Sequence, residues 1–106
     1  MTTISTHVLD TAAGKPAAGI AVQLERHGQI IGSGVTDADG RLKDLAGDGA
    51  AITSGEHSLR FSVGDYLGQE AFYGEIVIAF RVMADVDHYH VPLLLSPFGY
   101  STYRGS

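Results

Sequence analysis

Residues 76–83 read IVIAFRVM, and this stretch decides the fold class because its side chains alternate strictly between two faces. One face carries Ile76, Ile78, Phe80 and Val82, while the other includes Arg81. A period of two is typical of a β-strand with one face in the core, whereas a helix would repeat its apolar residues every three or four positions. The stretch therefore predicts a strand in a half-buried sheet.

The same period of two recurs on either side, at residues 20–25 and 58–63. Fourteen glycines separate the apolar stretches, and His27-Gly28 is placed for a tight hairpin. TDADGR at 36–41 and AGDGA at 46–50 are typical of turns. Residues 64–72 favour one short helix. Many short strands with regular turns predict an all-β protein, a two-sheet β-sandwich of about seven or eight strands.

Length and composition narrow the possible functions. The chain has 106 residues and 44% apolar residues, which suits a single globular domain over 1–106. It has no cysteine, which excludes disulfides and thiolate chemistry. Its net charge of −5 argues against a nucleic-acid partner. No stretch approaches the roughly 18 apolar residues of a membrane span, and no secretory pattern opens the chain. We expect a cytoplasmic protein with no membrane partner.

Two further strands place histidines on their outer faces. In residues 4–9, Ile4 and Val8 share one face and His7 lies on the other. In residues 88–95, His88 and His90 lie opposite the aliphatic face. Pro92 cannot donate a hydrogen bond to a neighbouring strand, so we expect it at an edge or a bulge. Histidines on a partly apolar outer face indicate a subunit interface or a ligand cleft.

These histidines allow more than one interpretation. His27 and His57 stand beside turn signals, and we expect both on the surface. His88 and His90 are two apart and could bind zinc if His7 supplied a third ligand. Arg41 follows a turn and could be an ordinary solvated loop residue or an electrostatic clamp. With no G-x-S-x-G motif present, acid–base chemistry by histidine is the best supported catalysis.

Three motifs, taken together, resemble one family. They are STHVLDTAAGKPAAGIAVQL from residue 5, TDADGR from residue 36, and HYHVPLLLSPFGYSTYRGS from residue 88. They are similar to those of the 5-hydroxyisourate hydrolases, the transthyretin-related enzymes of purine catabolism, in the same order and over essentially the whole chain. The final Tyr103-Arg104-Gly105-Ser106 is the most specific signal, because the transthyretin carriers lack it. The resemblance departs at Asp37, where asparagine is common.

The resemblance implies a fold, a reaction and a site. The fold is a transthyretin-like sandwich with one short helix. The reaction is hydrolysis of the cyclic amide of 5-hydroxyisourate to 2-oxo-4-hydroxy-4-carboxy-5-ureidoimidazoline. The motifs carry the catalytic roles onto His7, Arg41, His90 and Ser106, and substrate binding onto His7, Arg41 and Tyr103. No cofactor and no metal are implied. The implied assembly is a homotetramer with active sites where its dimers meet.

Two other functions compete with this one. The first is a transthyretin-like carrier that holds a small ligand without catalysis; it would have no use for two histidines, an arginine and the terminal tetrapeptide together. The second is a zinc-dependent amidohydrolase built on His7, His88 and His90. A sandwich with no site at all would leave the placement of Arg41 and the histidines unexplained.

Overall fold

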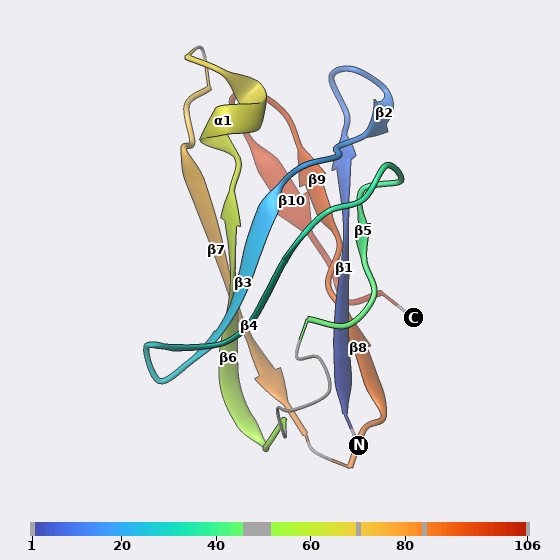
Figure 1. Ribbon diagram of the computed structural model, residues 1–106, viewed down its shortest axis with the longest axis vertical. Helices are drawn as coiled ribbons and strands as arrows, with labels where there is room; N and C mark the ends of the chain where they lie inside the picture. The colour runs from blue at the N-terminus through green and yellow to red at the C-terminus, as the bar shows by residue number, and fades with distance from the viewer. Residues whose placement is uncertain (1, 46–51, 70, 84, 106) are drawn as a thin grey trace.

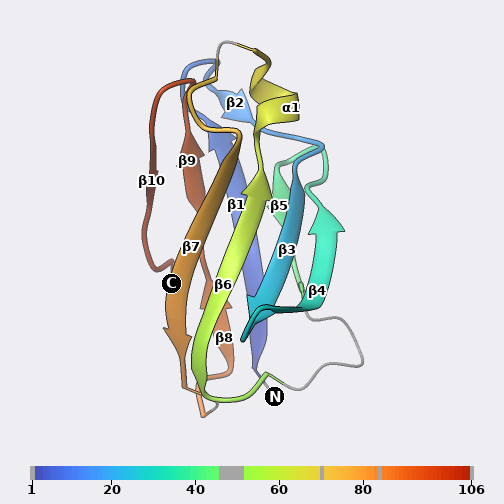
Figure 2. The same cartoon turned by 90° about the vertical axis from the view of Figure 1, so that its left-hand side faces the viewer.

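The computed structural model describes residues 2–45, 52–69, 71–83 and 85–105. Two sheets stack face to face, as Figure 1 and Figure 2 show, and a single helical turn lies at one end. The alternating faces predicted from the sequence explain the stacking, because each sheet has an apolar face that must be covered. The predicted two-sheet β-sandwich with one short helix is confirmed.

The first sheet is built around β1 (Thr3–Asp10). Its other members are β2 (Lys15–Pro16), β5 (Arg41–Leu42), β8 (His88–His90), β9 (Leu93–Leu95) and β10 (Tyr100–Thr102). β1 runs parallel to β8 and β9 and antiparallel to β2 and β5. In Figure 2, β8 and β9 lie on one side of β1 and β5 lies on the other. β1, from the first residues of the chain, therefore lies next to β8 and β9 from the last residues on one side and next to β5 from the middle of the chain on the other.

The second sheet has the order β4-β3-β6-β7. Its strands are β3 (Ala21–Arg26), β4 (Gln29–Val35), β6 (Gly55–Ser62) and β7 (Glu75–Val82). The predicted hairpin joins β3 to β4, with φ of 52° at His27 and 77° at Gly28. Two left-handed residues in succession give the turn whose twist matches that of the flanking strands.

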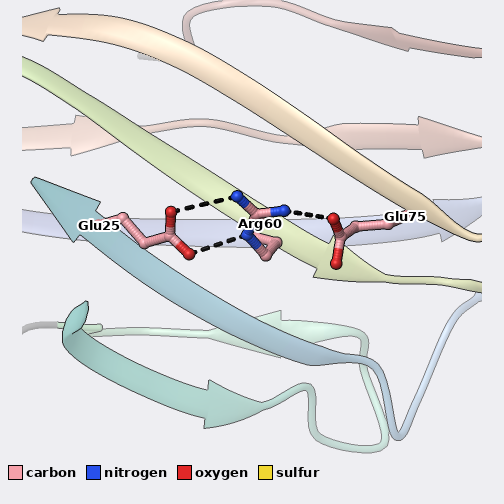
Figure 3. Close-up of polar contacts among 3 residues, drawn as sticks. All are labelled: Glu25, Arg60 and Glu75. Carbon is pink, nitrogen blue, oxygen red and sulfur yellow. Dashed lines mark hydrogen bonds and ion pairs between the residues drawn. The ribbon is translucent and has the colours of Figure 1, made fainter. Parts of the chain in front are cut away.

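One arginine ties three strands of this sheet together on its outer face. Arg60 of β6 donates from Nε to Glu25 of β3 at 2.8 Å, and it also pairs with Glu75 of β7. Figure 3 shows the guanidinium between the two carboxylates. The pairing lowers the pKa of Glu25, chiefly through the hydrogen bond from Arg60. Because the group lies on the outer face and is partly exposed to water, the pairing adds little to the stability of the fold.

The core lies between the sheets. Its buried side chains come from both sheets and include Ile4, Val8, Leu24, Leu59, Phe61, Ile76, Leu93 and Leu95. The inner faces of β1 and β8–β9 are thus the aliphatic faces, as predicted. His7 and His90 lie on the opposite, outer face and are half-buried. The fold consequently leaves the two imidazoles available for chemistry.

Several details differ from the sequence predictions. His57 was expected on the surface, and this was wrong, because its side chain is only 1% exposed. It shares the inner face of β6 with Leu59 and Phe61, and that alternation outweighs the nearby turn signal. The expected single strand over 88–95 is two strands, β8 and β9, since Val91 and Pro92 fall between them.

The remaining predictions concern short segments. The two-residue strands β2 and β5 were not expected, and with the split at Pro92 they raise the number of strands among the described residues to ten, above the predicted seven or eight. The predicted helix is confirmed but covers only α1 (Gly64–Leu67). The turn expected at 46–50 lies outside the described residues. Nowhere in the described ranges is a helix long and apolar enough to cross a membrane.

Candidate active site

Strand pairing gathers the candidate residues around β1. His7 lies opposite Arg41 in the antiparallel pairing of β1 with β5. Two residues earlier, Ser5 lies beside His90 in the parallel pairing of β1 with β8. Since residues two apart on a strand point to the same side, Ser5 and His7 face outward together. The sheet therefore places His7, Arg41 and His90 on one outer surface.

Asp37 stabilises the turn that precedes Arg41 and positions it. One of its carboxylate oxygens accepts hydrogen bonds from the backbone N–H of Asp39 at 2.9 Å and of Arg41 at 3.0 Å. The backbone hydrogen bond from Arg41 is the main reason why the pKa of Asp37 is lowered. Gly40 completes the turn with φ of 75°. A β-carbon there would lie 2.4 Å from the Val8 carbonyl oxygen, so only glycine fits.

An open pocket of about 380 Å³ lies on this surface. It is lined by Ser5, Thr6, Arg41, Leu42, Lys43, His88 and His90. Arg41 and Lys43 give it a positive charge, although the whole chain carries −5. A cleft with a local positive potential attracts small anions regardless of the net charge of the protein.

The ring of His90 is positioned by a hydrogen bond to a serine hydroxyl. Its Nδ1 is hydrogen-bonded to Ser5 Oγ at 2.7 Å. In the part of the chain that the structure describes, its Nε2 makes no hydrogen bond. Burial lowers the pKa of His90, and the positive charges of His7, His88 and Arg41 lower it further. His90 therefore stays neutral, and able to accept a proton, at lower pH than an ordinary histidine.

One hydrogen bond determines which ring nitrogen of His7 carries a proton. Its Nε2 lies 2.8 Å from the carbonyl oxygen of Asp39. A carbonyl oxygen can only accept, so Nε2 carries the proton and donates it. When the ring is neutral, Nδ1 is therefore the atom with a free lone pair. The turn that positions Arg41 thus also fixes the ring of His7.

The terminal segment, residues 103–105, is hydrogen-bonded to the backbone of His90. The N–H of Gly105 donates to the carbonyl oxygen of His90 at 2.8 Å. The guanidinium carbon of Arg104 lies 5.0 Å from the centre of the Tyr89 ring. Tyr103, in contrast, is 57% exposed and lines a separate pocket with Phe80 and Met83. Within one protomer the structure does not bring Tyr103 to the pocket of Arg41 and His90, and Ser106 lies outside the described residues.

The zinc alternative needs three ligands around one point. Across the described ranges, no three His, Cys, Asp or Glu side chains are arranged so that they could hold a metal ion. His88 instead directs Nε2 to Ser5 Oγ at 2.9 Å and Nδ1 to Thr3 Oγ1. Both nitrogens of this ring already have hydrogen-bond partners.

Sequence reasoning missed four residues that line the pocket, and two of them, Ser5 and Lys43, carry polar groups suited to catalysis or binding. Ser5 is two positions before His7, and Lys43 is two positions after Arg41. The period of two would have placed each on the same side as its functional neighbour. The bridging position of Ser5 between two histidines depends on the pairing of β1 with β8, which no local pattern contains.

Comparison with known proteins shows the family of this chain. The model of the HIUase/Transthyretin family matches residues 4–105. A 5-hydroxyisourate hydrolase of Mesorhizobium japonicum is 49% identical, over 97% of this chain and 91% of that protein. The solved 5-hydroxyisourate hydrolase of Klebsiella pneumoniae is 38% identical, covers all of both chains and superposes with a TM-score of 0.89.

A transthyretin is also similar in fold. Sea bream transthyretin, solved in complex with thyroxine, is 27% identical over 97% of this chain and 94% of its own, with a TM-score of 0.85. The likeness is lower in identity than that to the hydrolases. With a family model spanning nearly the whole sequence, this chain belongs to the HIUase/Transthyretin family.

Proposed function

We propose that this protein is an enzyme that hydrolyses the cyclic amide of 5-hydroxyisourate. The observation that carries the proposal is the pocket in which Arg41 of β5 and His90 of β8 meet across β1. Relatives named 5-hydroxyisourate hydrolase, at up to 49% identity, support the same substrate. The product is 2-oxo-4-hydroxy-4-carboxy-5-ureidoimidazoline, which places the reaction in urate degradation.

The hydrolysis requires a base for water. In the proposed mechanism, His90 accepts a proton from the attacking water at Nε2, the nitrogen without a hydrogen-bond partner among the described residues. The water oxygen bonds to the amide carbon, and the ring C–N bond then breaks. A positioned base of this kind typically accelerates a reaction by about 10²- to 10⁴-fold. The lowered pKa of His90 keeps it in the basic form near neutral pH.

Charge develops on the amide oxygen as the water attacks. Arg41 supplies planar N–H donors that suit an oxygen-rich anionic ring, and Lys43 adds a second positive charge at the same pocket. His7 orients the substrate, or donates a proton to the released nitrogen when Nδ1 is protonated as well as the Nε2 that bonds to Asp39. These assignments follow the motifs; Arg41 and His90 line the pocket, whereas His7 lies beside Arg41 on the same face of the sheet but is not a lining residue.

We further propose that the site is completed in a homotetramer, at the interface between dimers. In one protomer the pocket is open, and Arg41 and Tyr103 are exposed. A second protomer facing this surface would exclude water and could bring its own terminal segment to the substrate. Tyr103 and Ser106 then contribute from the assembly, as the resemblance implies. No cofactor is needed by this mechanism, and the cytoplasmic location stays a prediction.

The test uses urate oxidase to generate fresh substrate and follows the decay of its ultraviolet absorbance. His7→Asn and His90→Asn are expected to lower kcat/KM by about 10²-fold or more. His27→Asn is the matched control, because His27 is exposed in a left-handed turn where asparagine is well tolerated. Wild-type protein that fails to accelerate the decay would refute the function.

The same assay separates the alternatives. A carrier would bind substrate without consuming it, and removing residues 103–106 would leave its binding largely unchanged. A zinc enzyme would lose activity on treatment with a chelator and regain it with Zn²⁺. The proposed enzyme is expected to lose turnover on the truncation and to keep it in the presence of the chelator.

A further inference from the structure

An unbroken hydrogen-bonded row of side chains runs along the parallel strands β1 and β8. The pairing sets Thr3 beside His88 and Ser5 beside His90. Ser5 Oγ lies 2.9 Å from His88 Nε2 and 2.7 Å from His90 Nδ1, and His88 Nδ1 contacts Thr3 Oγ1. One buried hydroxyl thus bridges two imidazoles that both line the pocket, and of these His90 is half-buried while His88 is exposed to water.

The chemistry of these groups restricts where the protons lie. A neutral imidazole carries one N–H, and a serine hydroxyl donates one proton while accepting others. If Ser5 donates to one ring, it must accept from the other. Both rings then carry their proton at the same type of nitrogen, either Nδ1 in both or Nε2 in both. The first arrangement leaves the lone pair of His90 Nε2 free for a base, and the second puts a proton there for an acid.

We propose that Ser5 and His88 are positioning residues that relay protons for His90. As water loses a proton to His90 Nε2, the Nδ1 proton of His90 passes to Ser5 Oγ. The original hydroxyl proton of Ser5 then passes to His88 Nε2. One O–H bond of water breaks, one N–H bond forms on His88, and the intermediate bonds are exchanged without net change. The reverse sequence returns the proton to the nitrogen released from the substrate ring.

The relay moves the positive charge from His90 to His88, where a cation is better solvated. His90 is half-buried, and burial together with the charges of His7 and Arg41 disfavours a cation there. His88 is exposed, and water solvates its imidazolium. The lowered pKa of His90 is consistent with this direction of transfer. The inference rests on the proposed function for its kinetic consequence, although the hydrogen-bond order can be tested without substrate.

The kinetic experiment removes the bridging hydroxyl. Ser5→Ala is expected to lower kcat by about tenfold or more with KM nearly unchanged, since only proton transfer is affected. Ser5→Thr keeps a hydroxyl and should recover most of the loss. Ser62→Ala is the matched control, because Ser62 is exposed on β6 of the other sheet. A Ser5→Ala enzyme with wild-type kcat would overturn the relay.

A second variant distinguishes passing a proton from holding a side chain in place. In His88→Gln, the amide can still hydrogen-bond to Ser5 but does not take up a proton. The relay predicts that kcat falls about as far as in Ser5→Ala. If His88→Gln keeps wild-type kcat, Ser5 only holds the ring of His90 and the relay is wrong.

Imidazole ¹⁵N NMR of the free protein tests the hydrogen-bond order independently of activity. The relay requires His88 and His90 to share one tautomer in the wild type and to lose this correlation in Ser5→Ala. Opposite tautomers, with both rings donating to Ser5, would break the path and refute the proposal. An inactive wild type whose rings share a tautomer would refute the proposed function but leave the order of the hydrogen bonds intact.

Discussion

His90 combines two properties that a general base needs. Its Nδ1 is hydrogen-bonded to Ser5, which fixes the ring, and its environment disfavours the charged form. The two effects have different origins: the first comes from strand pairing, and the second from burial and from the positive groups around the pocket. Neither could be inferred from the letters HYH alone.

The pH dependence of the reaction follows from this environment. A base acts only when neutral, and burial lowers the pKa of His90 below the ordinary value of a histidine, about 6.5. The rate should therefore stay high as the pH falls to about 6.5 and decline only below it. The measurement is kcat/KM against pH with substrate made in place. An acidic midpoint well above that value would contradict the role of His90.

At the scale of elements, the terminal segment and β8 are fitted closely to each other. Gly105 pairs with His90 in an isolated bridge. A β-carbon at Gly105 would lie 2.5 Å from Cδ2 of the His90 ring. Any side chain here must displace either the segment or the imidazole.

Gly105→Ala is therefore expected to reduce kcat by about tenfold or more, because a small misplacement of a reacting group is costly. The midpoint of thermal unfolding should change little, since residues 103–105 contribute no side chain to the buried core. Gly99→Ala serves as the control, as its added carbon would meet only Ser96 Oγ at an ordinary 3.8 Å. Equal activity of both variants would show that the fit is not needed for catalysis.

Elements with a long alternating pattern were predictable, and those set by distant pairing were not. The inner faces of β3, β6 and β7 follow directly from their apolar residues, as does the outward direction of His7. β2 and β5 are two residues long and exist only because β1 supplies their partner. His57 shows that the same alternation, applied consistently, would have corrected the one misplaced histidine.

The residues of the candidate site likewise divide into those that sequence motifs predict and those whose contacts depend on distant strand pairing. His7, Arg41 and His90 could be selected from motifs, because each lies in a recognisable stretch of sequence. The bridge by Ser5 required knowing that residues 5 and 90 are neighbours, which rests on a parallel pairing across most of the chain. Tyr103 lies apart from the pocket in one protomer, so its proposed role depends on assembly.

At the scale of the whole molecule, the proposed tetramer makes activity depend on concentration. If the site is completed between dimers, specific activity should fall on dilution as the protein dissociates. Sedimentation velocity at the same concentrations would report the species present. A dissociated protomer that keeps full specific activity would show that the pocket of one chain is sufficient.

The parallel pairing of β1 with β8 and β9 also has a consequence for biosynthesis. A ribosome releases β1 before residues 88–95, which are its neighbours on one side. Until they emerge, one edge of β1 stays unpaired, and such edges are prone to aggregate in a nascent chain. Contacts between residues so far apart also slow folding. The pocket consequently forms only after β8 has been translated, so products that terminate before residue 88 have no catalytic surface.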